Sequence, residues 1–186
     1  MSETQKIKLA VNVSPDGRSF QETETPVAPE RQILIAAIGP AWRPEEDYAT
    51  AVADLIEARE LPSGVSNVDF GTGAIGIAYE VMRGYDALVL IDIDAGESGV
   101  RALSVAEVDE QAVDGGVEDG QELEPNGMDA DTVLRFIKYI GGWPGRIFTV
   151  GAAAPAEAGS EAEASPVGPA DAVDLVMATV EDLQHA

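Results

Sequence analysis

The sequence has no cysteine, a single histidine and few basic residues, and each shortage excludes a class of chemistry. Without cysteine there is neither a disulfide framework nor a thiolate nucleophile. The histidine, His185, is the second-to-last residue, and chain ends usually fray, so a Ser-His or Cys-His nucleophile system is not expected. No apolar run approaches the roughly 18 residues of a membrane span, and there is no apolar signal-like segment. We therefore expect a cytoplasmic protein without a membrane anchor.

Positive charge is also scarce. The chain has 34 acidic and 11 basic residues among 186, a formal net charge of −23. Self-repulsion on this scale argues against nucleic acid or an anionic membrane as a partner. It is typical of a protein that stays soluble in a salty cytoplasm, where charges are screened. The apolar fraction of 45% is ordinary, and the length suits one domain with a sizeable core.

Continuous apolar runs at Ile33–Ile38 and Ala87–Ile91 predict strands that are buried on both faces. Residues 100–108 alternate loosely and predict an antiparallel edge strand. Other patterns alternate along the chain: helix 44–56, strand 65–70, helix 75–83, helix 129–140, strand 146–150 and helix 169–180. In the first of these helices Ala49, Val52, Leu55 and Ile56 recur at helical spacing and are expected on its inner face, and Asp129 or Asp131 is expected to cap the third. We therefore predict an α/β fold, a three-layer sandwich with a mostly parallel central sheet and one antiparallel edge strand.

We expect one domain, residues 32–186, to carry this fold. Residues 1–31 are polar and predict an N-terminal extension, in which the alternation at 7–13 is compatible with an edge strand. Within the domain, residues 109–126 form an acidic loop, a composition typical of a solvated face. Residues 152–165 are low in complexity and are predicted to be flexible.

Carboxylates follow the predicted core strands. Asp92 and Asp94 end the central strand, Glu45 and Glu46 follow the first one, and Asn126 precedes a late helix. Ligands of open α/β sheets bind beyond the carboxyl ends of the strands, so these side chains could share a crevice. Carboxylates there suit a divalent metal or a general acid/base pair. Helix capping and plain surface charge explain the same residues equally well.

The segment Gly71–Gly76 matches the pattern G-x-G-x-x-G between a predicted strand and a predicted helix. The dinucleotide fingerprint normally follows the first core strand, however, and here that strand leads to Gly39-Pro40. An anionic pyrophosphate would also have to approach a very acidic protein. We do not expect a bound cofactor, and a nucleotide- or small-ligand-binding module is the weakest alternative.

The order of these segments resembles the hydrogenase maturation endopeptidases from about residue 33 to residue 183. Asn126–Leu134 matches the family segment H-G-M-D-x-x-T-V-L at every specified position but the first. Gly84–Asp92 and the strand-to-helix segment 68–79 are close to the family's pattern. Gly39–Asp47 stands where the family has G-N-x-L-x-x-D-[DE]-G.

The resemblance implies an endopeptidase that removes the C-terminal tail from the large-subunit precursor of nickel-iron hydrogenase after nickel insertion. In the family, an acid after the first strand, an Asp at the end of the central strand and a His before the late helix bind nickel. These positions correspond to Glu46, Asp92 and Asn126. The first two would be catalytic, and the nickel would be carried by the precursor, the expected partner.

Three residues in or beside this site depart from the family. Asn126 replaces the histidine, Pro40 replaces an asparagine, and Asp47 stands where glycine permits a tight turn. An amide oxygen is a harder and weaker donor than imidazole and cannot act as a base. Two functions therefore stay open: a working endopeptidase, and a catalytically impaired relative that binds a hydrogenase subunit as an assembly factor.

Overall fold

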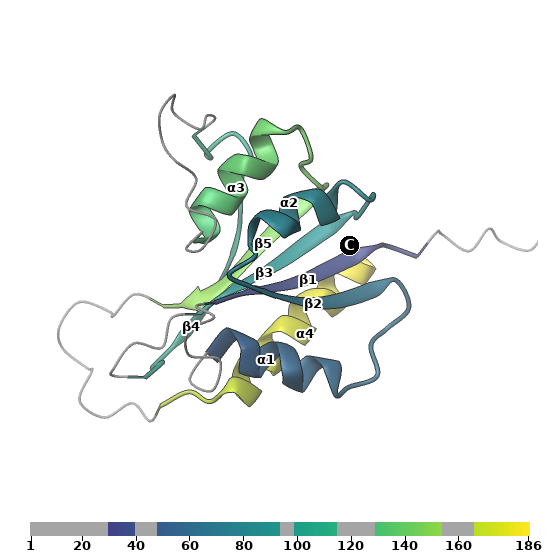
Figure 1. Cartoon of the computed structure of the whole chain (residues 1–186). Helices are drawn as coiled ribbons and strands as arrows, with labels where there is room; N and C mark the ends of the chain where they lie inside the picture. The colour runs from purple at the N-terminus through teal and green to yellow at the C-terminus, as the bar shows by residue number, and fades with distance from the viewer. Residues whose placement is uncertain (1–29, 40–47, 94–98, 115–128, 154–165) are drawn as a thin grey trace, which may run out of the picture.

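The computed structural model describes residues 30–39, 48–93, 99–114, 129–153 and 166–186. In these ranges, a five-stranded sheet lies between two layers of helices (Figure 1). Its strands are β1 (Ile33–Ile38), β2 (Val65–Gly71), β3 (Ala87–Asp92), β4 (Leu103–Glu107) and β5 (Arg146–Ala152). The α/β sandwich expected from the sequence is confirmed.

The strands lie in the order β2-β1-β3-β5-β4. The first four are mutually parallel, and β4 pairs antiparallel with β5 at the edge. Every residue of β1 is buried, as is every residue of β3 before Asp92, because both strands have neighbours on two sides and helices on two faces. This double burial explains their continuous apolar sequences. The mostly parallel sheet and its antiparallel edge strand are as predicted.

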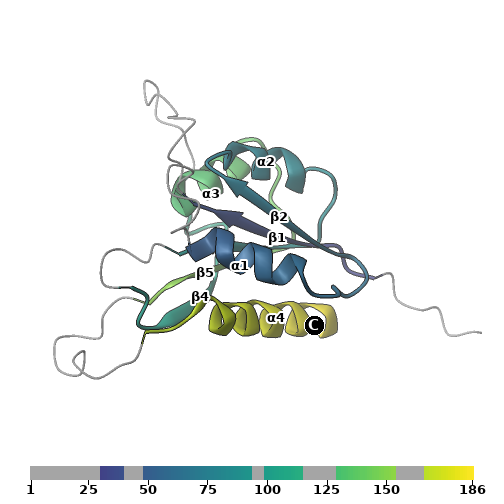
Figure 2. The same ribbon diagram turned by 60° about the horizontal axis from the view of Figure 1, so that its bottom comes forward.

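The four described helices are α1 (Tyr48–Glu57), α2 (Ile75–Val81), α3 (Ala130–Tyr139) and α4 (Pro169–His185). Figure 2 shows α1 and α4 side by side on one face of the sheet, and α2 and α3 on the other. The pleat of β1 serves both layers: Ile35 packs in the α1/α4 cluster, whereas Leu34 packs in the α2/α3 cluster. No helix in the described ranges is long and apolar enough to cross a membrane.

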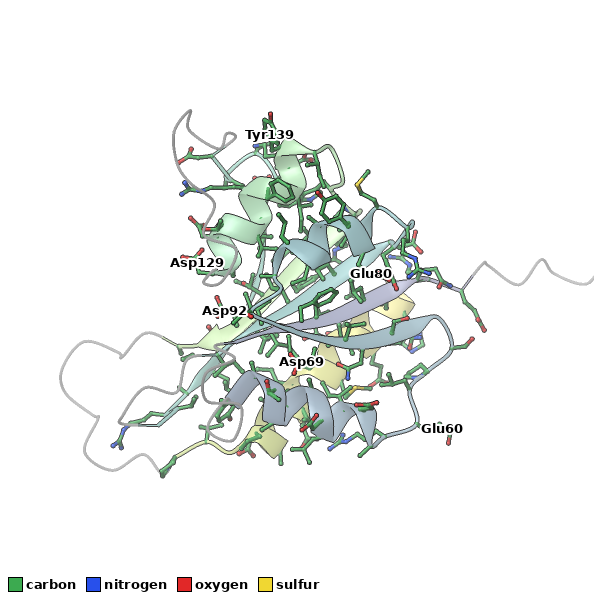
Figure 3. All side chains as sticks on the ribbon, in the orientation of Figure 1. Glu60, Asp69, Glu80, Asp92, Asp129 and Tyr139 are labelled. Carbon is green, nitrogen blue, oxygen red and sulfur yellow. The ribbon has the colours of Figure 1, made fainter. Side chains whose placement is uncertain are left out.

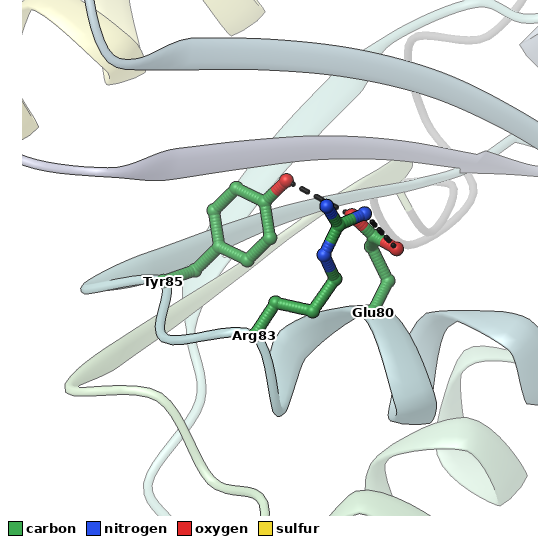
Figure 4. A network of polar contacts seen from close by, with 3 residues as sticks. All are labelled: Glu80, Arg83 and Tyr85. Carbon is green, nitrogen blue, oxygen red and sulfur yellow. Dashed lines mark hydrogen bonds and ion pairs between the residues drawn. The ribbon is translucent and has the colours of Figure 1, made fainter.

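The turn that leads into the central strand is held by a small polar network (Figure 4). One carboxylate oxygen of Glu80, on α2, accepts hydrogen bonds from Arg83 at 2.9 Å and from the Tyr85 hydroxyl at 3.1 Å. The network spans the chain reversal between α2 and β3. It therefore fixes the point from which β3 begins.

Some predicted boundaries and faces were wrong. α2 ends at Val81 rather than at residue 83, because its last turn tightens and Gly84, with φ of 101°, reverses the chain. Leu55 was expected on the inner face of α1 but is 43% exposed, and Ala53 is buried in its place. β5 continues through Ala152, which pairs with β4, so the predicted low-complexity segment begins with a strand residue.

Other predictions lie outside the described residues. They concern the N-terminal extension with its possible strand at 7–13, most of the acidic loop at 109–126 and most of the segment 152–165. The described part of the acidic loop, residues 109–114, includes Val113, which is buried against α3.

Candidate functional site

The carboxyl ends of β1 and β3 form the switch point of the sheet. From β1 the chain enters α1 on one face, and after β3 and the edge strand β4 it reaches β5 through α3 on the other face. Ile38 of β1 pairs with Asp92 of β3, which in turn pairs with Gly151 of β5. A crevice at such a point is where open α/β sheets bind ligands. Asp92 therefore occupies the place where the sequence predicted a functional carboxylate.

Asp92 contacts the first turn of α3. Its Oδ2 accepts a hydrogen bond from the backbone N–H of Ala130 at 3.0 Å. This N–H is among the first four of the helix, which lack partners within the helix, and the positive end of the helix dipole favours a carboxylate there. The strand end and the helix start are thereby held together, and the Asp92 side chain is oriented.

A second carboxylate, Asp129, caps the same helix. It accepts a hydrogen bond from the backbone N–H of Thr132 at 2.8 Å. The expectation that an aspartate caps this helix is confirmed. Figure 3 shows Asp129 at the start of α3, facing the end of β3 where Asp92 lies. Two carboxylates thus flank the N-terminus of α3.

Of the three residues proposed to engage nickel, the structure places Asp92 alone. Glu46 and Asn126 lie outside the described residues, as do Glu45, Asp94 and the departures Pro40 and Asp47. Within the described ranges, no three His, Cys, Asp or Glu side chains gather into a group that could hold a metal ion. Whether Glu46 and Asn126 approach Asp92 stays a prediction.

An open cleft of about 780 Å³ lies beside Asp92, between α3 and the β4–β5 edge of the sheet. Its one basic lining residue in the described part of the chain is Arg135, whose Nη2 lies 2.8 Å from a carboxylate oxygen of Asp131. Its acidic lining consists of Asp92, Glu107, Asp109, Asp114, Asp129 and Asp131. The cleft is therefore strongly negative.

Sequence reasoning missed this cleft. It treated the acids from residue 109 onward as a solvated face, and it did not place them opposite α3. The sequence held one indication of the cleft, because acidic residues stand at both ends of the loop, at Asp109 and Asp129. What brings these two ends together is the insertion of β5 between β3 and β4, which no local pattern reveals.

Two polar contacts join the elements around the candidate site. The hydroxyl of Tyr48, at the start of described α1, donates to the carbonyl of Val167 at 3.1 Å, and burial, with the nearby charge of Asp171, raises the pKa of Tyr48. At the far end of β4, Arg146 donates to both carboxylate oxygens of Glu107, at 2.6 and 2.9 Å. These hydrogen bonds lower the pKa of Glu107.

The glycine motif at 71–76 has a structural role. The N–H of Gly73 donates to the carbonyl of Phe70 at 2.7 Å, and the N–H of Gly76 donates to the carbonyl of Gly73 at 2.8 Å. A side chain at Gly76 would come within 3.1 Å of the Phe70 ring. Two amides that a pyrophosphate would need are thus engaged within the turn. The motif also follows an edge strand, β2, which argues against dinucleotide binding.

No protein-family model and no curated protein sequence matches the chain. Solved structures do. Hydrogenase 2 maturation peptidase from Thaumarchaeota archaeon SCGC_AB-539-E09 is 22% identical, with a TM-score of 0.50 over 81% of this chain and 99% of the other. The hydrogenase maturating endopeptidase HybD from E. coli is 16% identical, with a TM-score of 0.51 over 81% of this chain and 93% of the other.

A third match is the [NiFe] hydrogenase maturation protease HycI from Thermococcus kodakarensis KOD1. It is 18% identical, with a TM-score of 0.50 over 83% of this chain and 93% of the other. At these identities the likeness is one of fold. The resemblance found in the sequence is confirmed at that level: this chain has the fold of the hydrogenase maturation endopeptidases.

Proposed function

We propose that the protein is an endopeptidase of nickel-iron hydrogenase maturation that removes the C-terminal tail of the large-subunit precursor after nickel insertion. The observation that carries this proposal is Asp92, an oriented carboxylate at the switch point of a fold shared with maturation peptidases. The family's sequence segments, in their order and spacing, support the same partner.

Glu46, Asp92 and Asn126 would engage the nickel of the precursor. Glu46 precedes Tyr48 of α1 by two residues, and Asn126 precedes the cap Asp129 by three. Three residues span at most about 11 Å. Both helices start on the side of the sheet where β1 and β3 end, so the chain is long enough for Glu46 and Asn126 to reach Asp92. This supports the assignment of Glu46 and Asn126.

The nickel ion belongs to the precursor and is therefore part of the substrate. A metal beside the scissile peptide bond polarises a carbonyl or lowers the pKa of a nearby water, and either change promotes hydrolysis. The role of Asp92 follows from its orientation. With Oδ2 held by the Ala130 N–H, its carboxylate is presented in one direction, either to the metal or to the attacking water. We assign no separate general base.

The second candidate function is that of a non-catalytic assembly factor that binds a hydrogenase subunit. The replacement of the expected histidine by Asn126 favours it, because an amide is a weaker nickel ligand and cannot act as a base. Pro40 and Asp47 change the same region. The partner would be the same large-subunit precursor, bound without turnover.

The test is intact-mass spectrometry of a nickel-loaded large-subunit precursor incubated with the protein. We expect loss of a C-terminal peptide with the wild-type chain and with Asp54→Ala, an exposed carboxylate on α1, but not with Asp92→Ala. An unchanged mass with a stable complex would establish the assembly factor instead. Neither cleavage nor a complex would contradict both functions.

A further inference from the structure

One side of the β4 backbone has no partner within the described chain. β4 lies at the edge of the sheet. Two hydrogen bonds at its ends show which of its backbone groups face β5 and which face outward. The N–H of Val108 donates to Ile147 at 2.8 Å, and the N–H of Ala153 donates to Ala102 at 2.9 Å. In an antiparallel pair the inward groups alternate, so Ser104 and Ala106 face β5. The N–H and C=O groups of Leu103, Val105 and Glu107 point outward.

β4 has few of the features that usually prevent an edge strand from pairing with another chain. Residues 103–107 contain no proline, no lysine and no bulge, and their one charged residue, Glu107, is paired with Arg146. The opposite edge, β2, is different. Its register shifts beside Asp69, whose carboxylate bonds the N–H of Gly71. β4 is thus the regular edge, ready to pair with an added strand.

The two faces of β4 differ in chemistry. Leu103 and Val105 pack against the α1/α4 core, whereas Ser104, on the opposite face, lines the acidic cleft. A strand added beside β4 would alternate in the same way. Every second side chain would lie beside Leu103, Val105 and the Glu107–Arg146 pair, and the others would lie beside the acidic cleft.

We propose that β4 binds an extended segment of a partner protein by strand addition, and that this segment alternates apolar with basic side chains. Main-chain hydrogen bonds to residues 103, 105 and 107 would supply affinity, and the alternation would supply specificity. The net charge of −23 adds long-range attraction for a basic segment. Electrostatic complementarity therefore selects the occupant.

The proposed strand would lie within reach of Asp92. Ser104 pairs with Gly151, and Gly151 pairs with Asp92, so three inter-strand steps separate the added strand from Asp92. At about 4.8 Å a step this is about 14 Å, which four or five extended residues span. That the segment belongs to the hydrogenase precursor, beside its cleavage site, rests on the proposed function; strand addition itself does not.

The probe is a fluorescein-labelled peptide of four Val-Lys repeats, whose binding to the full chain is followed by anisotropy. The decisive variant is Val105→Pro, which removes an outward N–H without breaking a bond to β5, a position where edge strands tolerate proline. Val105→Ala, which keeps the N–H, is the control. We expect about tenfold weaker binding by Val105→Pro than by Val105→Ala, the effect of one lost main-chain hydrogen bond.

Two further peptides make the test independent of how the variant folds. A peptide of four Val-Glu repeats and a Val-Lys peptide with methylated backbone nitrogens should both fail to bind the wild-type chain. Equal binding of either one would overturn the proposal, as would equal affinities of Val105→Pro and Val105→Ala or no binding of the Val-Lys peptide.

The two proposals fail separately. Peptide binding with no cleavage of the precursor would support strand addition and contradict the endopeptidase. Cleavage of the nickel-loaded precursor without binding of the Val-Lys peptide would do the reverse.

Discussion

The Oδ2 atom of Asp92 and the backbone N–H of Ala130, 38 positions apart in the sequence, lie 3.0 Å apart and form a hydrogen bond. This bond joins the end of the central strand to the start of α3. It gives Asp92 a structural role besides its proposed catalytic one. Any substitution of Asp92 must therefore be assessed for stability as well as for activity.

Replacing Asp92 should separate these two roles. Asp92→Ala leaves the Ala130 N–H without its partner, and we expect a loss of about 1–2 kcal/mol in the free energy of unfolding. Asp92→Asn keeps an oxygen acceptor and should lose less than half as much, yet precursor cleavage should cease with both. Urea denaturation and intact-mass spectrometry measure the two effects. Equal stabilities of the Ala and Asn variants would contradict the structural role.

Restoring the expected histidine should strengthen nickel binding. Asn126→His replaces an amide oxygen with an imidazole, which suits nickel better, so we expect at least tenfold tighter binding in calorimetry. Gln111→His, in the described part of the acidic loop, controls for a histidine added nearby. An unchanged affinity in Asn126→His would show that positions 46, 92 and 126 do not converge.

Thermal stability should rise with monovalent salt. A net charge of −23 destabilises the compact state through self-repulsion, and salt at molar concentration shortens the range of that repulsion to about 3 Å. We expect the melting temperature to increase steadily between low and molar sodium chloride. An uncharged osmolyte at equal osmolality is the control. A flat melting temperature across the salt series would contradict the salty-cytoplasm interpretation.

The pair Glu107–Arg146 should make stability depend on acid pH. Hydrogen bonds from Arg146 lower the pKa of Glu107 from its ordinary value of 4.5. A carboxyl group whose pKa falls on folding stabilises the folded state above its unfolded pKa, and that contribution is lost as the pH falls through the folded pKa. Stability should therefore decrease less below pH 4.5 in Glu107→Gln than in the wild-type chain.

An NMR titration of the Glu107 carboxyl group checks the cause directly. Its pKa should lie below the ordinary value in the wild-type chain and return towards it in Arg146→Gln. Glu110→Gln, an exposed neighbour, should leave the titration of Glu107 unchanged. A Glu107 pKa that does not respond to Arg146→Gln would exclude the pair as the cause.

The parts of the fold that were predictable are those in which burial leaves a local pattern. β1 and β3 are buried on both faces, so the runs at 33–38 and 87–91 identified them almost to the residue. A cap at Asp129 or Asp131 was predictable because a position before an amphipathic stretch is itself local, and the structure shows that the cap is Asp129. Leu55 was misplaced because an inner and an outer apolar residue look alike in a single helical stripe.

The candidate site was only partly predictable. The place of Asp92 at the carboxyl edge follows from the end of one strand, a local feature. The acidic cleft depends on β5 being inserted between β3 and β4, although β5 follows β4 in the sequence and is the last of the described strands. Which backbone side of β4 faces outward depends in turn on its register with β5. The pairing of two distant segments leaves no periodic pattern in the amino-acid sequence of either segment.

The bond between Asp92 and Ala130 also supplies a spectroscopic reporter. A cation that binds the Asp92 carboxylate withdraws electron density from the oxygen that accepts the Ala130 N–H. The amide proton of Ala130 should then become less deshielded, and its nitrogen shift should move with it. Occupation of the site can thus be followed at one backbone resonance, without a label on the metal or the precursor.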